Sequence, residues 1–205
     1  MLLSLTKQFL FIANLKTAST SIERILSPHA EIRLLQANFG KHQTFVEFAE
    51  RFRWILSCTS VSDLFIFGVI REPVDFVLSL YNSHRRDQFK DNPKLYTGGL
   101  DFDGFISEWV PKNNDQLKNQ YLRFLGSEGR LVTNLLISYG KLDSGLEIVA
   151  EKLGVPDLTK LPRTNTSPQG LKREDLTREQ VDWIEKRFRK DIEFIEHHAD
   201  RLNEA

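Results

Sequence analysis

A continuous apolar run that leads straight into a proline-initiated helix constrains the fold of this chain most. Leu64–Ile70 reads LFIFGVI, and a short run of this kind is typical of a strand buried on both faces of a parallel sheet. Arg71 and Glu72 follow, and Pro73 then stands where proline favours the first turn of a helix. A buried strand followed directly by a helix predicts an α/β fold.

A second strand, turn and helix lie near the start of the chain. Phe9–Ala13 is apolar, Asn14–Ser21 is polar, and apolar residues then recur at helical spacing as far as Leu26. The first turn of a helix presents unpaired N–H groups and partial positive charge, so it can bind an anion beside Lys16. The residues of the turn that accompany Lys16 are Thr17, Ala18, Ser19, Thr20 and Ser21.

The hydroxyl groups of this turn have two readings. They can donate hydrogen bonds to phosphoryl or sulfuryl oxygens, or they can simply cap a helix next to an exposed lysine. The stretch is not a Walker A loop, because that motif needs glycines and there is no glycine between residues 1 and 39.

The rest of the chain continues the alternation of strands and helices. Further strands are predicted at Glu31–Leu35 and Arg130–Ile137. Capping boxes predict helices that start at Thr44–Glu47, Ser144–Glu147 and Thr177–Gln180, the last of them one long helix. Apolar spacing predicts helices over 73–81, 102–111 and 115–125 as well. We therefore expect a single domain, residues 1–205, with a central, mainly parallel sheet flanked by helices.

Charge and cysteine content limit the partners. The 28 basic and 28 acidic side chains balance, which argues against a nucleic-acid or anionic-membrane partner. The single cysteine excludes an internal disulfide and fits a reducing compartment. The histidines show no metal-ligand spacing, so no metal is expected. We expect a cytoplasmic protein without a signal peptide or membrane anchor, since the apolar start of the chain is short.

Two strand exits carry cationic residues. Lys16 follows the first strand and Arg71 follows the central one, with Ser79 further along the next helix. Ligands of parallel sheets bind beyond the carboxyl ends of the strands. If the two strands are neighbours, the site has two anion pockets, which suit a nucleotide that is phosphorylated at both ends.

These motifs resemble those of the sulfotransferases that use 3′-phosphoadenosine 5′-phosphosulfate (PAPS), in the branch related to carbohydrate sulfotransferases. FIANLKTASTSIE is similar to their 5′-phosphosulfate loop, and FGVIREPVDFVLSLYN to their 3′-phosphate motif. GKHQTFVEF resembles the turn that carries the base in that branch, and LPRTNTS its closing segment. The likeness extends from about residue 8 to residue 195.

Two positions depart from the family pattern. Leu15 stands where the family usually has proline, and Phe76 stands where the 3′-phosphate motif often has a second arginine. The loss of this second arginine weakens the 3′-phosphate pocket unless Arg163 or another basic group takes its place.

The resemblance implies a P-loop-NTPase-like sulfotransferase fold and transfer of a sulfuryl group to an acceptor hydroxyl, carbohydrate-type by analogy. It implies that Lys16 and its turn hold the 5′-phosphosulfate, and that Arg71 and Ser79 hold the 3′-phosphate. His42 would be the base that deprotonates the acceptor; the alternative is an ordinary surface histidine. The absence of the Golgi members' anchor would fit a soluble bacterial enzyme.

Two other classes of protein remain open from the sequence. A kinase-like P-loop protein would share the strand, turn and helix, but it should carry a glycine cradle and a magnesium-binding acidic strand end. A catalytically inactive nucleotide-binding module would bind the nucleotide without turnover.

Overall fold

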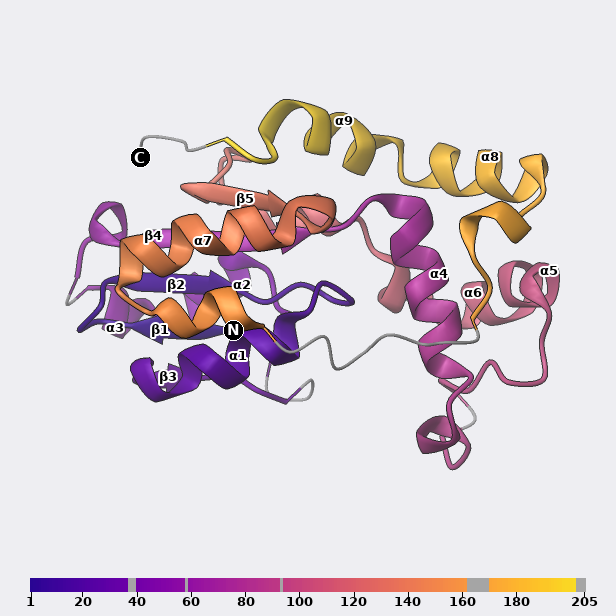
Figure 1. Ribbon diagram of the computed structural model, residues 1–205, viewed down its shortest axis with the longest axis horizontal. Helices are drawn as coiled ribbons and strands as arrows, with labels where there is room; N and C mark the ends of the chain where they lie inside the picture. Colours follow the sequence, from indigo (N-terminus) through magenta and orange to yellow (C-terminus); the bar gives the residue numbers. More distant parts are fainter. Residues whose placement is uncertain (37–39, 58, 93, 162–169, 202–205) are drawn as a thin grey trace. The chain divides into compact units, whose positions relative to one another are not determined.

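The computed structural model describes residues 1–36, 40–57, 59–92, 94–161 and 170–201 (Figure 1). Its strands are β1 (Leu2–Ser4), β2 (Phe9–Ile12), β3 (Ile32–Arg33), β4 (Phe65–Ile70) and β5 (Leu135–Ser138). Its α-helices are α1 (Ser19–Leu26), α2 (Phe45–Arg51), α3 (Arg53–Leu56), α4 (Pro73–His84), α5 (Phe102–Gly104), α6 (Val110–Lys112), α7 (Leu142–Leu153), α8 (Arg178–Arg187) and α9 (Arg189–His198).

The contacts within the chain group it into two compact units. The sheet unit consists of Met1–Arg71, Gln120–Thr164 and Phe194–Ala205. The helical unit consists of Glu72–Asn119 and Asn165–Glu193. Both are assembled from segments that are distant in the sequence, and α9 contributes to each.

The sheet has five strands in the order β3-β1-β2-β4-β5. β4 pairs in parallel with both β2 and β5, so the predicted α/β fold is confirmed and the two cation-bearing strands are neighbours. The prediction of a mainly parallel sheet is wrong at the other edge, where β1 is antiparallel to β2 and to β3. The connection from β1 to β2 is too short for a parallel crossover, so the two strands form a hairpin.

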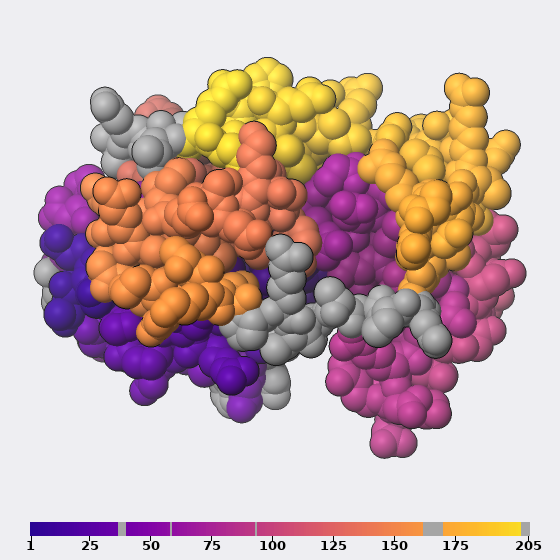
Figure 2. All heavy atoms as spheres, in the orientation of Figure 1, coloured from indigo at the N-terminus to yellow at the C-terminus, as the bar shows by residue number. Residues whose placement is uncertain are grey.

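Alternating side chains of the strands divide the core of the sheet unit into two layers. On one face, Phe9, Phe11 and Phe67 pack with residues of α1 and α7. On the other face, Leu10, Ile12 and Ile66 pack with α2 and α3. Figure 1 shows α1 and α7 in front of the sheet and α2 and α3 behind it. α7 also forms part of the molecular surface in the same view (Figure 2).

Two of the three predicted capping boxes are confirmed. The Thr44 and Thr177 hydroxyls each accept a hydrogen bond from a backbone N–H of the following turn. The Glu47 and Gln180 side chains in turn accept a bond from the backbone N–H of Thr44 and Thr177. The box predicted at Ser144 is wrong, because α7 already begins at Leu142 and the Ser144 hydroxyl donates to the carbonyl of Lys141 (3.1 Å).

Other predicted helices are interrupted. The helix predicted behind Thr44 breaks at Phe52, and the predicted C-terminal helix breaks at Phe188, both of which leave the helical backbone conformation. The helix predicted over 115–125 is replaced by two 3₁₀ segments, Asn114–Leu117 and Gln120–Phe124. The helix predicted to end at Pro111 continues to Lys112.

The helical unit has its own aromatic core. Tyr81 of α4 packs edge-on against Phe102, and Phe105 stacks on Trp109. Phe76 is almost fully buried and meets Phe188 edge to face, with 5.9 Å between the ring centroids. The position where the family motif often has a second arginine is therefore a core position in this chain.

Candidate functional site

The turn after β2 has an unusual backbone. Lys16 and Ala18 both have positive φ angles, 61° and 58°, which residues other than glycine seldom adopt. The Asn14 side chain accepts a bond from the N–H of Leu15 (2.8 Å), and the Thr17 hydroxyl donates to the carbonyl of Asn14 (3.1 Å). Such conformations persist where the surroundings hold them, and they are concentrated at functional sites.

The hydroxyl residues of this turn differ in their surroundings. Thr17, Ser19 and Ser21 are buried, whereas Thr20 is exposed. The N-cap residue of α1 is Ala18, which has no side-chain hydrogen-bonding group. The hydroxyl of Thr17 already donates to a backbone carbonyl, so it serves the shape of the turn.

Arg71 reaches this turn from the adjacent strand. It follows β4 directly, and its Nη1 donates to the carbonyl oxygen of Lys16 (3.1 Å). Its guanidinium carbon lies 4.2 Å from the centre of the Tyr139 ring, a cation–π contact. Tyr139 itself follows β5, so the carboxyl ends of three parallel strands carry Lys16, Arg71 and Tyr139.

His42 lies in the segment between β3 and α2, and it contacts the residue just before this turn. Its Nδ1 lies 3.1 Å from the carbonyl oxygen of Ala13. A carbonyl oxygen only accepts, so Nδ1 carries the hydrogen, and Nε2 of the neutral ring has a free lone pair. The pKa of His42 is lowered to about 4, mainly by burial and to a smaller extent by the positive charges of Lys41 and Arg123, while the hydrogen bond to Ala13 raises it. His42 is therefore neutral at pH 7 and can accept a proton at Nε2.

Three contacts hold the segment that carries His42. Arg123 donates from Nε to the carbonyl oxygen of His42 (3.1 Å). The Nζ of Lys41 forms an ion pair with Oε2 of Glu23 in α1 (2.6 Å) and donates to the Thr20 hydroxyl (3.1 Å). The segment is thus tied to the first turns of α1.

Glu23 also pairs with a second cation. Its Oε1 accepts a bond from the amino group of Met1 (2.7 Å), and both groups are buried. Burial lowers the pKa of this amino group, while the Glu23 carboxylate raises it. Glu23 therefore balances positive charge next to the helix that follows the Lys16 turn.

The structure brings together part of the predicted site. Arg71 and His42 both contact the backbone between Ala13 and Lys16, through the bonds given above. Ser79 is a half-buried residue of α4, in the helical unit. Arg163 lies outside the described residues.

Sequence reasoning did not select several residues that shape the site. They are Asn14, Glu23, Lys41, Gln120, Arg123 and Tyr139. Tyr139 had a detectable signal, since it follows an apolar run in the same way as Lys16 and Arg71. Gln120 had none, because it lies in a polar segment far from either strand in sequence.

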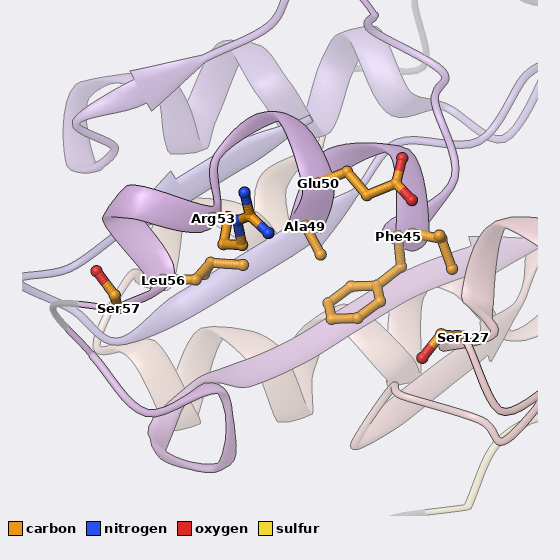
Figure 3. A pocket seen from close by; sticks show the side chains of 8 residues that line it. Phe45, Ala49, Glu50, Arg53, Leu56, Ser57 and Ser127 are labelled. Atoms are coloured by element: carbon orange, nitrogen blue, oxygen red, sulfur yellow. The ribbon is translucent and has the colours of Figure 1, made fainter.

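A separate groove of about 440 Å³ lies beside α2 and α3 (Figure 3). Phe45, Ala49 and Leu56 give it an apolar lining, and Glu50, Arg53 and Ser127 add polar groups. None of the residues that line it belongs to the predicted site.

The described part of the chain contains no cluster of three or more His, Cys, Asp or Glu side chains that could hold a metal ion. No described helix is both long enough and apolar enough to cross a membrane. Compared with models of protein families, with curated proteins and with solved structures, the chain gives no match.

Proposed function

We propose that the protein is a sulfotransferase that moves a sulfuryl group from PAPS to an acceptor hydroxyl, of carbohydrate type. The observation that carries the proposal is that Arg71 and His42 both contact the backbone of the segment that ends at Lys16, in the turn after β2. These residues come from three segments of the sequence, and each has the chemistry that its proposed role needs.

Lys16 and the N-terminus of α1 would hold the 5′-phosphosulfate. PAPS supplies an activated sulfuryl group on a phosphate leaving group. Transfer breaks the bond between sulfur and the phosphate oxygen and forms a bond from sulfur to the acceptor oxygen. Lys16 stabilises the negative charge that develops on the departing phosphate. Arg71 donates charge-assisted hydrogen bonds to the 3′-phosphate.

His42 would take the proton that the acceptor hydroxyl loses. Its Nδ1–H is committed to the carbonyl oxygen of Ala13, which fixes the ring and leaves Nε2 as the accepting atom. A base that is held in one tautomer is suited to proton transfer. The acceptor's proton therefore goes to Nε2, and its oxygen is free to bond to sulfur.

The proposal predicts a nucleotide preference. 3′-Phosphoadenosine 5′-phosphate should raise the melting temperature more than 5′-AMP or ATP at equal concentration, because binding to the native state stabilises it by mass action. Arg71→Ala should reduce affinity for the bisphosphate by about ten- to a hundredfold, the scale of a hydrogen bond to a charged group, and affect AMP little.

Calorimetric titration of both proteins with both nucleotides checks this prediction. Equal affinities of the wild type for AMP and the bisphosphate would contradict the two-pocket site and favour a kinase-like protein. A clear preference for the bisphosphate, without turnover of PAPS on a broad acceptor panel, would instead favour an inactive nucleotide-binding module.

A further inference from the structure

Gln120 joins the ends of the two strands that carry the candidate site. It is fully buried at the start of the 3₁₀ segment Gln120–Phe124. Its Oε1 accepts a bond from the backbone N–H of Arg71 (3.1 Å), and its Nε2 donates to the backbone carbonyl of Arg71 (2.7 Å). Because the N–H only donates and the carbonyl only accepts, these two bonds fix the orientation of the amide.

The same amide reaches the neighbouring strand. Oε1 of Gln120 also accepts a bond from Nδ2 of Asn14 (2.9 Å), and Nδ2 donates as well to the carbonyl of Val69 (3.2 Å). Asn14 is fully buried too. One buried pair of amides, Asn14 and Gln120, therefore links the start of the Lys16 turn to the backbone of Val69 and Arg71.

This pair stands where the strand ladder has ended. The register of β2 and β4 stops at Ile12 and Gly68, and that of β4 and β5 stops at Ile70. Beyond these points, no strand pairing among the described residues includes Arg71. The Gln120 amide bonds to both backbone groups of Arg71 as a neighbouring strand would, and so continues the pairing by one residue.

We propose that Gln120 is a positioning residue that fixes the distance between the two anion pockets and thereby sets the preference for a nucleotide phosphorylated at both ends. The inference rests on the proposed function, because it assigns the 3′-phosphate to Arg71. Preorganised donors bind a ligand more tightly, since no ordering of the site is needed on binding. A loosened Arg71 backbone should therefore cost affinity for the 3′-phosphate in particular.

Gln120→Met tests the proposal, because methionine is an unbranched side chain of similar length that lacks the amide. We expect the ratio of the AMP and bisphosphate dissociation constants, measured by calorimetry, to fall roughly tenfold, the scale of one charge-assisted hydrogen bond. Gln116→Met is the matched control. Gln116 is half-buried and donates to the Asp115 side chain, so its replacement should leave the ratio unchanged.

The ratio separates positioning from a purely structural role, which would lower stability and both affinities together. The result that would overturn this inference has two parts. The Gln120→Met ratio would stay within about twofold of wild type, while Arg71→Ala would lower the ratio on the scale of a charged hydrogen bond. The proposed function would stand in that case. A wild type without any preference for the bisphosphate would overturn the proposed function, and this inference with it.

A measurement on the wild type keeps the proposal testable if Gln120→Met fails to fold. The Arg71 amide proton is bonded to Gln120, so it should exchange slowly with solvent before any nucleotide is added. Hydrogen exchange followed by NMR reports this directly. An unprotected Arg71 amide in the nucleotide-free protein would show that the pocket is not held in advance, and the proposal would fail.

Discussion

His42 has a lowered pKa, which keeps its ring unprotonated at neutral pH. At its ordinary pKa of 6.5, part of the histidine would be protonated near neutrality, whereas burial lowers the value to about 4. We therefore expect wild-type turnover to stay level as the pH falls from 7 to about 5, and to drop with a midpoint near 4. Release of the desulfated nucleotide, in the presence of a confirmed acceptor, gives this profile.

Replacement of the base should be costly. His42→Ala should reduce turnover by about 10²–10⁴, the usual scale of general-base catalysis, and should remove the acidic limb of the profile. His197→Ala is the control, since His197 is exposed in the last helix. A rate for His42→Ala within about threefold of wild type, well below the general-base scale, would move the base elsewhere.

Two other titratable side chains that could serve as the base in place of His42, Glu47 and His84, are held by other contacts. Glu47 accepts bonds from the N–H (2.7 Å) and the hydroxyl (3.0 Å) of Thr44 at Oε2, which holds its carboxylate in the capping box. His84 is buried between the rings of Phe89 and Trp109. In His42, by contrast, the bond from Nδ1–H to Ala13 leaves Nε2 as the accepting atom.

Individual site residues were predictable where they follow an apolar strand. Lys16 and Arg71 were selected in this way, and the pairing of β2 with β4 confirms that their strands are neighbours. Gln120 and Arg123 could not be found, because their contacts join segments that are far apart in sequence. The lowered pKa of His42 was equally hidden, since it results mainly from burial, and Arg123 is brought close only by folding.

At the scale of the elements, the capping box ahead of α2 supports the segment next to His42. Thr44→Ala removes the hydroxyl that accepts the N–H of Glu47 (3.2 Å). Loss of such a cap costs about 1 kcal/mol, so hydrogen exchange in the first turn of α2 should become roughly fivefold faster. Nucleotide affinity should be unchanged, because the phosphates are assigned to Lys16 and Arg71.

Thr177→Ala is the matched variant for this test. Thr177 heads an equivalent capping box at α8, where its hydroxyl accepts the N–H of Gln180 (3.3 Å). Exchange should accelerate by a similar factor in α8 and not in α2. A Thr44→Ala protein whose α2 amides exchange at the wild-type rate would show that this cap does not stabilise the helix.

Capping boxes were predictable only where the sequence around them also favours a helix start. The Thr44 and Thr177 boxes follow polar segments, and both are formed. At Ser144 the helix begins earlier, and the residue is the third of its first turn. The breaks at Phe52 and Phe188 were not predictable, because the apolar spacing continues across them and tertiary packing decides where the helix bends.

At the scale of the whole molecule, the sequence indicated the layered α/β architecture but not its edge. Phe9–Ile12 and Phe65–Ile70 were recognisable as central strands because they are apolar throughout. β1 is only three residues long, too short for its alternation to be read. Its hairpin with β2 makes the sheet mixed. The grouping into two units likewise depends on contacts between distant segments, which periodicity does not report.

The stability of the whole protein should depend on the protonation of His42. Its pKa is 6.5 when unfolded and about 4 when folded, so between these values the unfolded chain binds a proton that the native protein does not. The free energy of unfolding therefore falls as the pH is lowered from about 6.5 to about 4 and levels off below, as far as this group is concerned. The full effect is about 3 kcal/mol at 1.36 kcal/mol per pKa unit.

His42→Gln isolates this effect in denaturant titrations at stepped pH. Glutamine does not titrate, and its amide can still donate to the carbonyl oxygen of Ala13. The difference in unfolding free energy between wild type and variant should shrink or reverse by about 3 kcal/mol between pH 6.5 and 4. His197→Gln, at an exposed position, should follow the wild-type curve. Parallel curves for wild type and His42→Gln would mean that His42 is solvated in the folded protein, and the buried, tautomer-fixed base would have to be abandoned.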